Sequence, residues 1–351
     1  MAAYKNNMRF AKALGNAVGT IQLLKQFYTA QYRFSFAKPL PVSIPNAFAA
    51  LSLRTQAILC VLFSVCVWAG WMIISSYSVR RSLTAYDITA LRFGVAGLIL
   101  MPVLIKKGLR IGPHGIWGSL AMAFLLGAPF NIITIFGMKF APASHAAGLI
   151  NTTMLTVVTL GSILLLREAT TRLRIAGIVV SIVGIACLLY SAKHATVSDN
   201  ATLGHLMFML GGAMWAGYAL CAKAWKTDPL HATAIVCSMS CLMYLPIYFL
   251  FLPSHIGMDN LGEVVFQGTY QGLINSVFAL LCFNRGIAIL GASTASAFLP
   301  LIPVLATLLA IPLLGEIPGA QEMLGILLAA TGVFLATGTA DRLLIRKSIT
   351  N

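Results

Sequence analysis

Uncharged polar side chains lie inside otherwise apolar runs of this chain, where they could recognise a small molecule. An Asn amide both donates and accepts hydrogen bonds, which suits a zwitterion or a heterocycle. Polar groups are costly in lipid and therefore tend to face the interior of a helix bundle. The candidates for a substrate cavity are Asn131, Asn151, Thr152, Asn275 and Ser276. Hydrogen bonding between helices is the alternative role for each of them.

Aromatic residues form a second candidate set. Trp68, Trp215 and Tyr218 occupy related places in two apolar runs and could stack on a planar substrate. Packing or anchoring at the membrane surface is the alternative role, and it is the one we expect for Trp71.

Three residues are candidates for a hinge or gate. Pro300 and Pro303 lie inside an apolar run, where a proline removes a backbone hydrogen bond and bends or interrupts a helix. Such interruptions in a carrier point to the binding site, although a static kink is the alternative. Arg92 could contact an anion or gate a pathway, but it could also reach the membrane surface or pair with Asp87.

Other conspicuous residues are expected to be structural. Glu168 and Glu316 precede apolar runs, where a carboxylate complements the N-terminus of a helix. Four glycines, with small residues between them, predict close contact between two helices. They are Gly177, Gly184, Gly325 and Gly332. His145 and His205 each open an apolar run without an acidic residue nearby in the sequence, so we expect polar residues at the membrane surface, although either could titrate near neutral pH.

Composition places all these residues in a membrane. The chain has 351 residues, of which 59% are hydrophobic and only 9% are charged, and its mean hydropathy is +0.87. A soluble protein needs more charge to cover its surface. The net charge of +15 does not indicate nucleic-acid binding, because Lys and Arg lie in short loops and in the N-terminal segment. Seven cysteines without CxxC spacing predict neither disulfides nor a metal site, and we expect no cofactor.

Apolar runs of about 20 residues predict an all-α integral membrane protein with ten transmembrane helices. The spans are expected near residues 57–76, 87–105, 116–138, 143–166, 173–192, 203–222, 232–252, 264–283, 292–314 and 320–340. Loops and the C-terminal tail on one side carry twelve Lys or Arg residues, against four on the other. The positive-inside rule then puts both termini in the cytoplasm.

The two halves of the chain repeat each other. Trp68-Ala69-Gly70 returns as Trp215-Ala216-Gly217, and Glu168 and Glu316 follow equivalent spans. Gly177 and Gly184 likewise match Gly325 and Gly332. Because each repeat has five spans, an odd number, the second must enter the membrane from the opposite side. Inverted repeats of this kind are typical of secondary transporters, in which two halves rock about a central site.

In its order of motifs the chain resembles the EamA group of the drug/metabolite transporter superfamily. The pattern is a Trp-small-Gly in the first span, Asp87 followed by Arg92-Phe93 in the second, a fourth span that starts with small residues, then Glu and a Gly-containing fifth span. The resemblance implies ten helices, cytoplasmic termini, and export or exchange of amino acids, purines or related metabolites. One departure is that Pro300 and Pro303 stand in the ninth span, whereas the fourth has Asn151-Thr152-Thr153.

We therefore expect four parts: a basic N-terminal extension over 1–54, repeats over 55–194 and 195–341, and a tail over 342–351. We expect this extension to be cytoplasmic or poorly ordered, or a start-site artefact, and a targeting segment or a surface helix is the alternative. Alternating-access transport of small metabolites, with export as the expected direction, is the predicted function, in a bacterial inner membrane. A membrane-embedded enzyme and a non-transporting scaffold are the alternatives, although no catalytic motif is present. A small-molecule substrate and lipid are the expected partners, a homodimer is left open, and nucleic acid is excluded.

Overall fold

A computed structural model describes the backbone of residues 51–167, 170–194 and 200–336. The C-terminal tail, Glu168 and all but the end of the N-terminal extension lie outside these ranges. The helices of the first repeat are α3 (Leu53–Val79), α4 (Ala85–Lys107), α5 (Ile116–Leu126), α6 (Ala128–Phe140), α7 (Ala143–Leu164) and α8 (Arg172–His194). Those of the second are α9 (Ala201–Ala224), α10 (Pro229–Phe251), α11 (Leu261–Gln267), η1 (Gly268–Phe278), α12 (Ala279–Leu290), α13 (Ala292–Ser296), α14 (Leu301–Leu314) and α15 (Ala320–Ala336).

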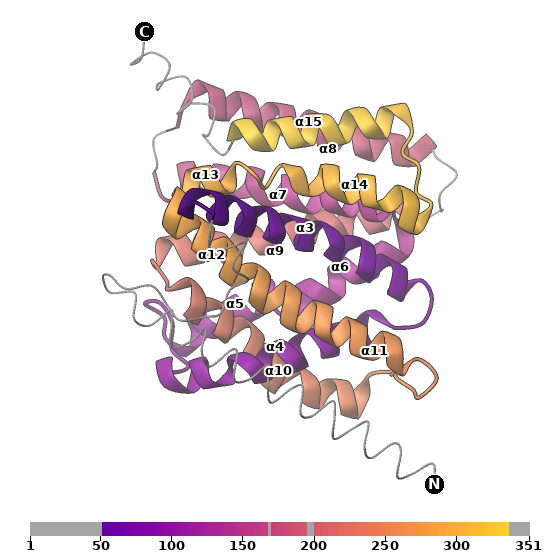
Figure 1. The fold of residues 1–351 in the computed structure, drawn as a ribbon. Coiled ribbons are helices and arrows are strands. Elements are labelled where there is room, and N and C mark those ends of the chain that lie inside the picture. The colour runs from indigo at the N-terminus through magenta and orange to yellow at the C-terminus, as the bar shows by residue number, and fades with distance from the viewer. Residues whose placement is uncertain (1–50, 168–169, 195–199, 337–351) are drawn as a thin grey trace. The chain divides into compact units, whose positions relative to one another are not determined.

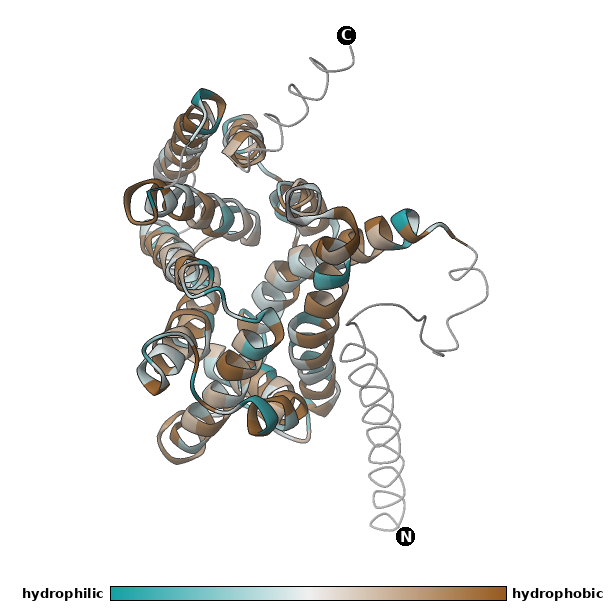
Figure 2. Ribbon diagram, turned by 90° about the vertical axis from the view of Figure 1, so that its left-hand side faces the viewer, coloured by the Kyte–Doolittle hydropathy of each residue, from teal (hydrophilic) through white to brown (hydrophobic). Residues whose placement is uncertain are grey.

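These helices form the ten predicted spans. Within the described ranges, nine helical stretches are long and apolar enough to cross a membrane, and α15 is a shorter apolar helix of 17 residues. Figure 2 shows apolar residues along the helices. Large side chains such as Ile105 and Phe251 are more than three-quarters exposed, as expected of a surface that faces lipid.

Two of the spans are less regular than expected. The third is divided into α5 and α6 at Gly127, because the Ser240 side chain of α10 approaches the backbone there. A Cβ on Gly127 would lie 2.1 Å from Ser240 Oγ, and the Ala128 N–H donates to that oxygen over 3.2 Å. The eighth span joins α11 and α12 through the π-helix η1, in which Ser276 Oγ donates to the Gln271 carbonyl five residues earlier at 2.8 Å.

The two repeats pack in a related way. The first span of each, α3 or α9, lies against the third and fourth spans of the other: α3 contacts η1, α12 and α14, while α9 contacts α5, α6 and α7. The second spans, α4 and α10, lie side by side, as do the fifth spans, α8 and α15 (Figure 1). Each repeat therefore completes the other, and neither half forms a separate bundle.

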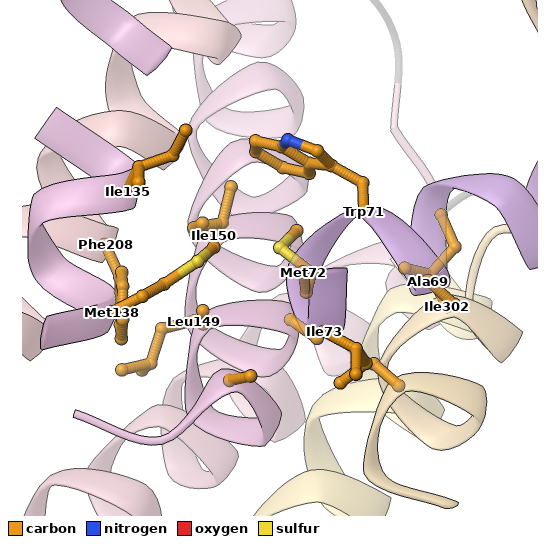
Figure 3. Close-up of a cluster of buried hydrophobic side chains, with 14 of the residues drawn as sticks. Ala69, Trp71, Met72, Ile73, Ile135, Met138, Leu149, Ile150, Phe208 and Ile302 are labelled. Carbon is orange, nitrogen blue, oxygen red and sulfur yellow. The ribbon is translucent and has the colours of Figure 1, made fainter. Parts of the chain in front are cut away.

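A buried apolar cluster joins spans of both repeats. Trp71, Met72 and Ile73 of α3 meet residues of α6, α7, α9 and α14 (Figure 3). Lipid tails are as apolar as these side chains, so close packing is what holds such helices together. Trp71 is only 4% exposed. Of the two roles expected for Trp71, packing and anchoring at the membrane surface, the structure shows packing, because α3 turns this face toward α6.

Candidate substrate site and gate

Of the charged residues on α4, Arg92 is the one nearest the middle of the bundle. It lies about two turns inside that helix, roughly 10 Å from its start. Its Nη1 donates to Asn131 Oδ1 over 2.8 Å, and Asn131 Nδ2 donates to Thr89 Oγ1 over 2.9 Å. The buried Nε has no hydrogen-bond partner. Arg92 forms no ion pair with a carboxylate in the described part of the chain.

The alternative pairing of Arg92 with Asp87 does not occur. Asp87 instead forms a capping box with Thr84 at the start of α4. It also accepts from Tyr248 Oη, at 2.6 Å, and from the His255 N–H. With its carboxylate oxygens engaged there, Asp87 leaves the guanidinium charge uncompensated.

Aromatic rings lie beside this guanidinium. The Arg92 guanidinium carbon is 5.3 Å from the centre of the Trp71 ring, within range of a cation–π contact. Trp71 stacks on Phe130, with ring centres 6.1 Å apart, and Trp215 meets Phe130 edge-on at 6.1 Å. The buried Trp71 Nε1 also lacks a partner. Cation, free indole N–H and aromatic faces together could hold a molecule that has both a negative group and an apolar part.

The other predicted polar residues divide into two groups. Asn151 Nδ2 donates to the Ala147 carbonyl of its own helix at 2.8 Å, and Ser276 is bonded within η1. These two are satisfied locally. Thr152 Oγ1 and Asn275 Oδ1 are buried without a partner, so they remain candidates to bind a substrate.

The remaining aromatic candidates lie on the same two helices. Trp68 of α3 is partly buried against Phe283, with ring centres 5.0 Å apart. Tyr218 is half-buried on α9, three residues after Trp215. The structure thus joins Trp215 to the Arg92 region through Phe130, whereas Trp68 packs on α12.

The two prolines of the ninth span differ in position. Pro300 stands between α13 and α14 and is the N-cap of α14, so it separates two helices. Pro303 lies buried in the first turn of α14, and its carbonyl accepts from Thr307 Oγ1 at 2.8 Å. The equivalent span α7 is an unbroken helix of 22 residues.

Ionic contacts join the repeats at one end of the bundle, which we call the Glu316 end. Glu316, just after α14, forms an ion pair of 2.9 Å with Arg80, just after α3. It also accepts from the Ala143 and Ser144 N–H groups at the start of α7. Glu316 was expected to serve the helix that follows it, but it caps α7 because the loop after α14 folds across that helix N-terminus. Arg80 further donates to the Met138 and Ala141 carbonyls.

His145 and His205 meet at the same end. Their Nδ1 and Nε2 atoms are 2.9 Å apart, and His145 Nε2 is 3.3 Å from Glu322 Oε1. Both rings are at most 1% exposed. The expectation of isolated polar residues at the membrane surface is wrong, because the acidic partner comes from α15, far along the chain.

Polar contacts also join the repeats at the opposite end. Lys107, at the end of α4, pairs with Asp228 at 2.9 Å. Asp228 caps α10 by accepting from the His231 N–H. Burial opposes ionisation of Asp228, but that N–H and the Lys107 ammonium outweigh it and lower the pKa of the carboxyl.

The four predicted glycines lie where α8 meets α15. A Cβ on Gly177 would be 2.5 Å from the Ala336 nitrogen, and one on Gly184 would be 2.6 Å from the Ala329 nitrogen. Gly325 and Gly332 face this contact from α15. Only residues without a β-carbon allow the two backbones to approach so closely.

An apolar pocket of about 180 Å³ lies between α5, α6 and α10. Ser240 and Tyr244 are its polar lining residues, but their hydroxyls bond to Ala128 N and the Tyr86 carbonyl. This pocket is therefore almost entirely apolar, unlike the surroundings of Arg92.

Known proteins share this architecture. A solved crystal structure aligns with 83% of this chain and 99% of its own, with a TM-score of 0.54 and 20% sequence identity. An uncharacterized transporter of Archaeoglobus fulgidus is 23% identical over 81% of this chain and 98% of its own. A protein of Streptantibioticus cattleyicolor named as a probable terminal-alkyne amino-acid exporter is 27% identical over 80% of this chain and 93% of its own.

The sequence model of the EamA-like transporter family matches twice, over residues 55–190 and 202–338. Two matches of similar length agree with the ten spans, the paired packing of the helices and the family resemblance seen in the motifs. The chain is a multi-pass membrane protein and belongs to the EamA-like transporter family.

Proposed function

We propose that this protein is a secondary carrier for small metabolites that bear a carboxylate, with amino acids as the leading class. The observation that carries the proposal is Arg92, a cation that no described carboxylate neutralises. A charged group inside a membrane bundle is retained at a cost, and a bound anion offsets that cost. Asn131 holds the guanidinium in place through its 2.8 Å hydrogen bond.

The neighbouring aromatic rings fit the rest of such a molecule. Trp71 and Trp215 flank Phe130, so an apolar side chain would meet ring faces while its carboxylate meets Arg92. One relative bears the name of an amino-acid exporter, which supports the same substrate class here. Asn275 Oδ1 and Thr152 Oγ1 are buried without a partner and are further candidates to accept a hydrogen bond from a substrate.

We place the carrier in a bacterial inner membrane with both termini in the cytoplasm, on the charge difference between its two sets of loops. The Glu316 end then faces outward. Export, the absence of a catalytic step, the division into repeats at 55–194 and 195–341, and a homodimer all stay predictions.

Counterflow in proteoliposomes tests the substrate class. Vesicles loaded with unlabelled L-phenylalanine should accumulate labelled L-phenylalanine, and added L-leucine or L-alanine should be screened in the same way. Phenethylamine lacks the carboxylate and phenylalaninamide has it neutralised, so both should compete at least tenfold more weakly. Equal competition by these two compounds would contradict the role of Arg92, and a lack of counterflow with every amino acid would reject the proposed class.

A further inference from the structure

Two histidines and a carboxylate form a closed polar group at the Glu316 end. His145 of α7 lies between His205 of α9 and Glu322 of α15, at 2.9 Å and 3.3 Å respectively. The rings are buried, and 14% of the Glu322 side chain is exposed. The group therefore connects one span of the first repeat to two spans of the second, at the N-terminal ends of α7, α9 and α15.

The geometry limits how many protons the two rings can hold. The short contact between His145 Nδ1 and His205 Nε2 needs one nitrogen with a hydrogen and one with a free lone pair. His145 Nε2 lies 3.3 Å from Glu322 Oε1 without completing a hydrogen bond in this geometry. A nearby carboxylate favours the tautomer with the hydrogen on Nε2, and in that tautomer His145 Nδ1 accepts from His205. One added proton can be held, because either ring may then donate to the other and Glu322 supplies the opposite charge.

A second added proton cannot be held in this arrangement. Both facing nitrogens would carry hydrogens, and two imidazolium charges would stand in contact. His205 Nδ1 is buried without a partner, so nothing in the described surroundings stabilises that second charge. Full protonation therefore opposes the closed contact between α7 and α9.

The other charged groups around α7 are already engaged. Glu316 pairs with Arg80 and caps α7, and the Lys139 ammonium of α6 lies 5.2 Å from the Phe136 ring. The arginines at the start of α8 lie near the C-terminal end of α7, whereas His145 is at the N-terminal end of α7. Among the described side chains, Glu322 is thus the counter-charge of the histidine pair.

We propose that His145, His205 and Glu322 form a proton-binding site. The site keeps the Glu316 end closed while the two rings hold at most one added proton, and it allows that end to open when they hold two. This inference rests on the proposed carrier function, since it assigns a driving ion to the opening of one side. Proton entry from that side would separate α7 from α9 and α15 and so open the Glu316 end. The carrier would then couple its cycle to protons without any carboxylate in the middle of a span.

The test measures opening at Ser144, which precedes His145 of the proton-binding site and is 3% exposed. A Ser144→Cys chain in detergent is treated with a charged maleimide at about pH 7.5 and about pH 5.5, across the range in which histidine titrates. The signal from the seven native cysteines, measured on the parent chain, is subtracted. The rate is divided by that of the same chain with His145→Gln and His205→Gln, because Gln keeps a donor and an acceptor but does not titrate. This ratio cancels the pH dependence of the thiol.

The ratio should rise at least threefold on acidification, and a constant ratio would overturn the proposal. His231→Gln is the matched control: His231 bonds to the Gly108 carbonyl at the opposite end, so this variant should keep the full rise. If the double variant does not fold, Glu322→Gln is tested instead. The increase in labelling rate on acidification should then occur at lower pH than without this substitution, and an increase at the same pH would again overturn the proposal. The assay uses no substrate, so a failure of amino-acid counterflow would reject the carrier proposal separately.

Discussion

The second spans of the two repeats, α4 and α10, pack alike but differ in charge. Both α4 and α10 begin after a capping residue, Thr84 or Asp228, and they lie against each other near Gly97, whose Cβ would be 2.3 Å from Cys241 Cβ. Eight residues after the cap stands Arg92 in α4 but Val236 in α10. The repeats therefore share their packing, while the charge that could bind a substrate belongs to the first repeat.

The fourth spans differ in the opposite sense. In the first repeat α7 is continuous and its N-terminus is held by Glu316. In the second repeat the span is divided at Pro300 into α13 and α14. The two fourth spans therefore differ in continuity: the first repeat has an unbroken helix here, and the second has a helix interrupted at Pro300.

Replacing Arg92 should have the largest effect on counterflow among the substitutions that test this comparison. Arg92→Ala removes a charge-assisted contact worth about 1.5–3 kcal/mol and should raise the half-saturating concentration for amino-acid counterflow about 10- to 100-fold. Val236→Ala, the matched change in α10, should alter it less than about threefold. Similar losses in both variants would show that the asymmetry at this position has no role in binding.

Replacing the asparagines of the third and eighth spans, Asn131 and Asn275, should have smaller effects than replacing Arg92. Asn131→Ala releases the Arg92 guanidinium and should reduce counterflow about 5- to 10-fold, from the loss of about one hydrogen bond to a charged group. Asn275→Ala removes an oxygen without a protein partner and should cost about two- to threefold through its contact with substrate. Flux and thermal stability are measured on the same samples. Unchanged flux with lowered stability would make Asn275 a packing residue.

The broken ninth span should affect rate more than affinity. Pro300→Ala allows α13 and α14 to join, because Ala favours helix and restores a backbone N–H. We expect the maximal rate of counterflow to fall about threefold with little change in half-saturation. Pro312→Ala, near the end of α14, is the control and should leave the rate unchanged. A normal rate for Pro300→Ala would assign this proline to packing.

Much of the fold follows from the sequence because lipid imposes simple rules. Length and hydropathy locate the spans, and the glycine spacing predicts the contact between α8 and α15. The interruption at Gly127 was not predictable in this way, since it depends on a hydroxyl from Ser240 in another span.

The site was harder to predict than the fold. Its decisive pairs, such as Arg92 with Asn131 and His145 with Glu322, join residues that the sequence separates widely. A signal was nevertheless present, because the same interval of 144 residues separates Thr84 from Asp228, Trp71 from Trp215 and Asn131 from Asn275. Aligning the repeats on their helix caps would have matched Trp71 with Trp215.

Gly→Ala substitutions in the fifth spans should give the smallest effects, and the loss of stability should depend on how closely each new Cβ meets the facing helix. A Cβ on Gly177 would meet the backbone of α15, at 2.5 Å from Ala336 N and 2.8 Å from the Gly332 carbonyl oxygen. A Cβ on Gly325 would be farther from its neighbours, at 3.0 Å from Leu188 Cγ and 3.2 Å from both Cys187 Cβ and the Gly184 carbonyl oxygen. Gly177→Ala should therefore destabilise the protein by about 1–3 kcal/mol, and Gly325→Ala by clearly less. Thermal unfolding in detergent measures both. Because a new Cβ would be closer to its neighbours at Gly177 than at Gly325, a larger loss for Gly325→Ala would contradict this order and mean that the helices shift to relieve the contact at Gly177.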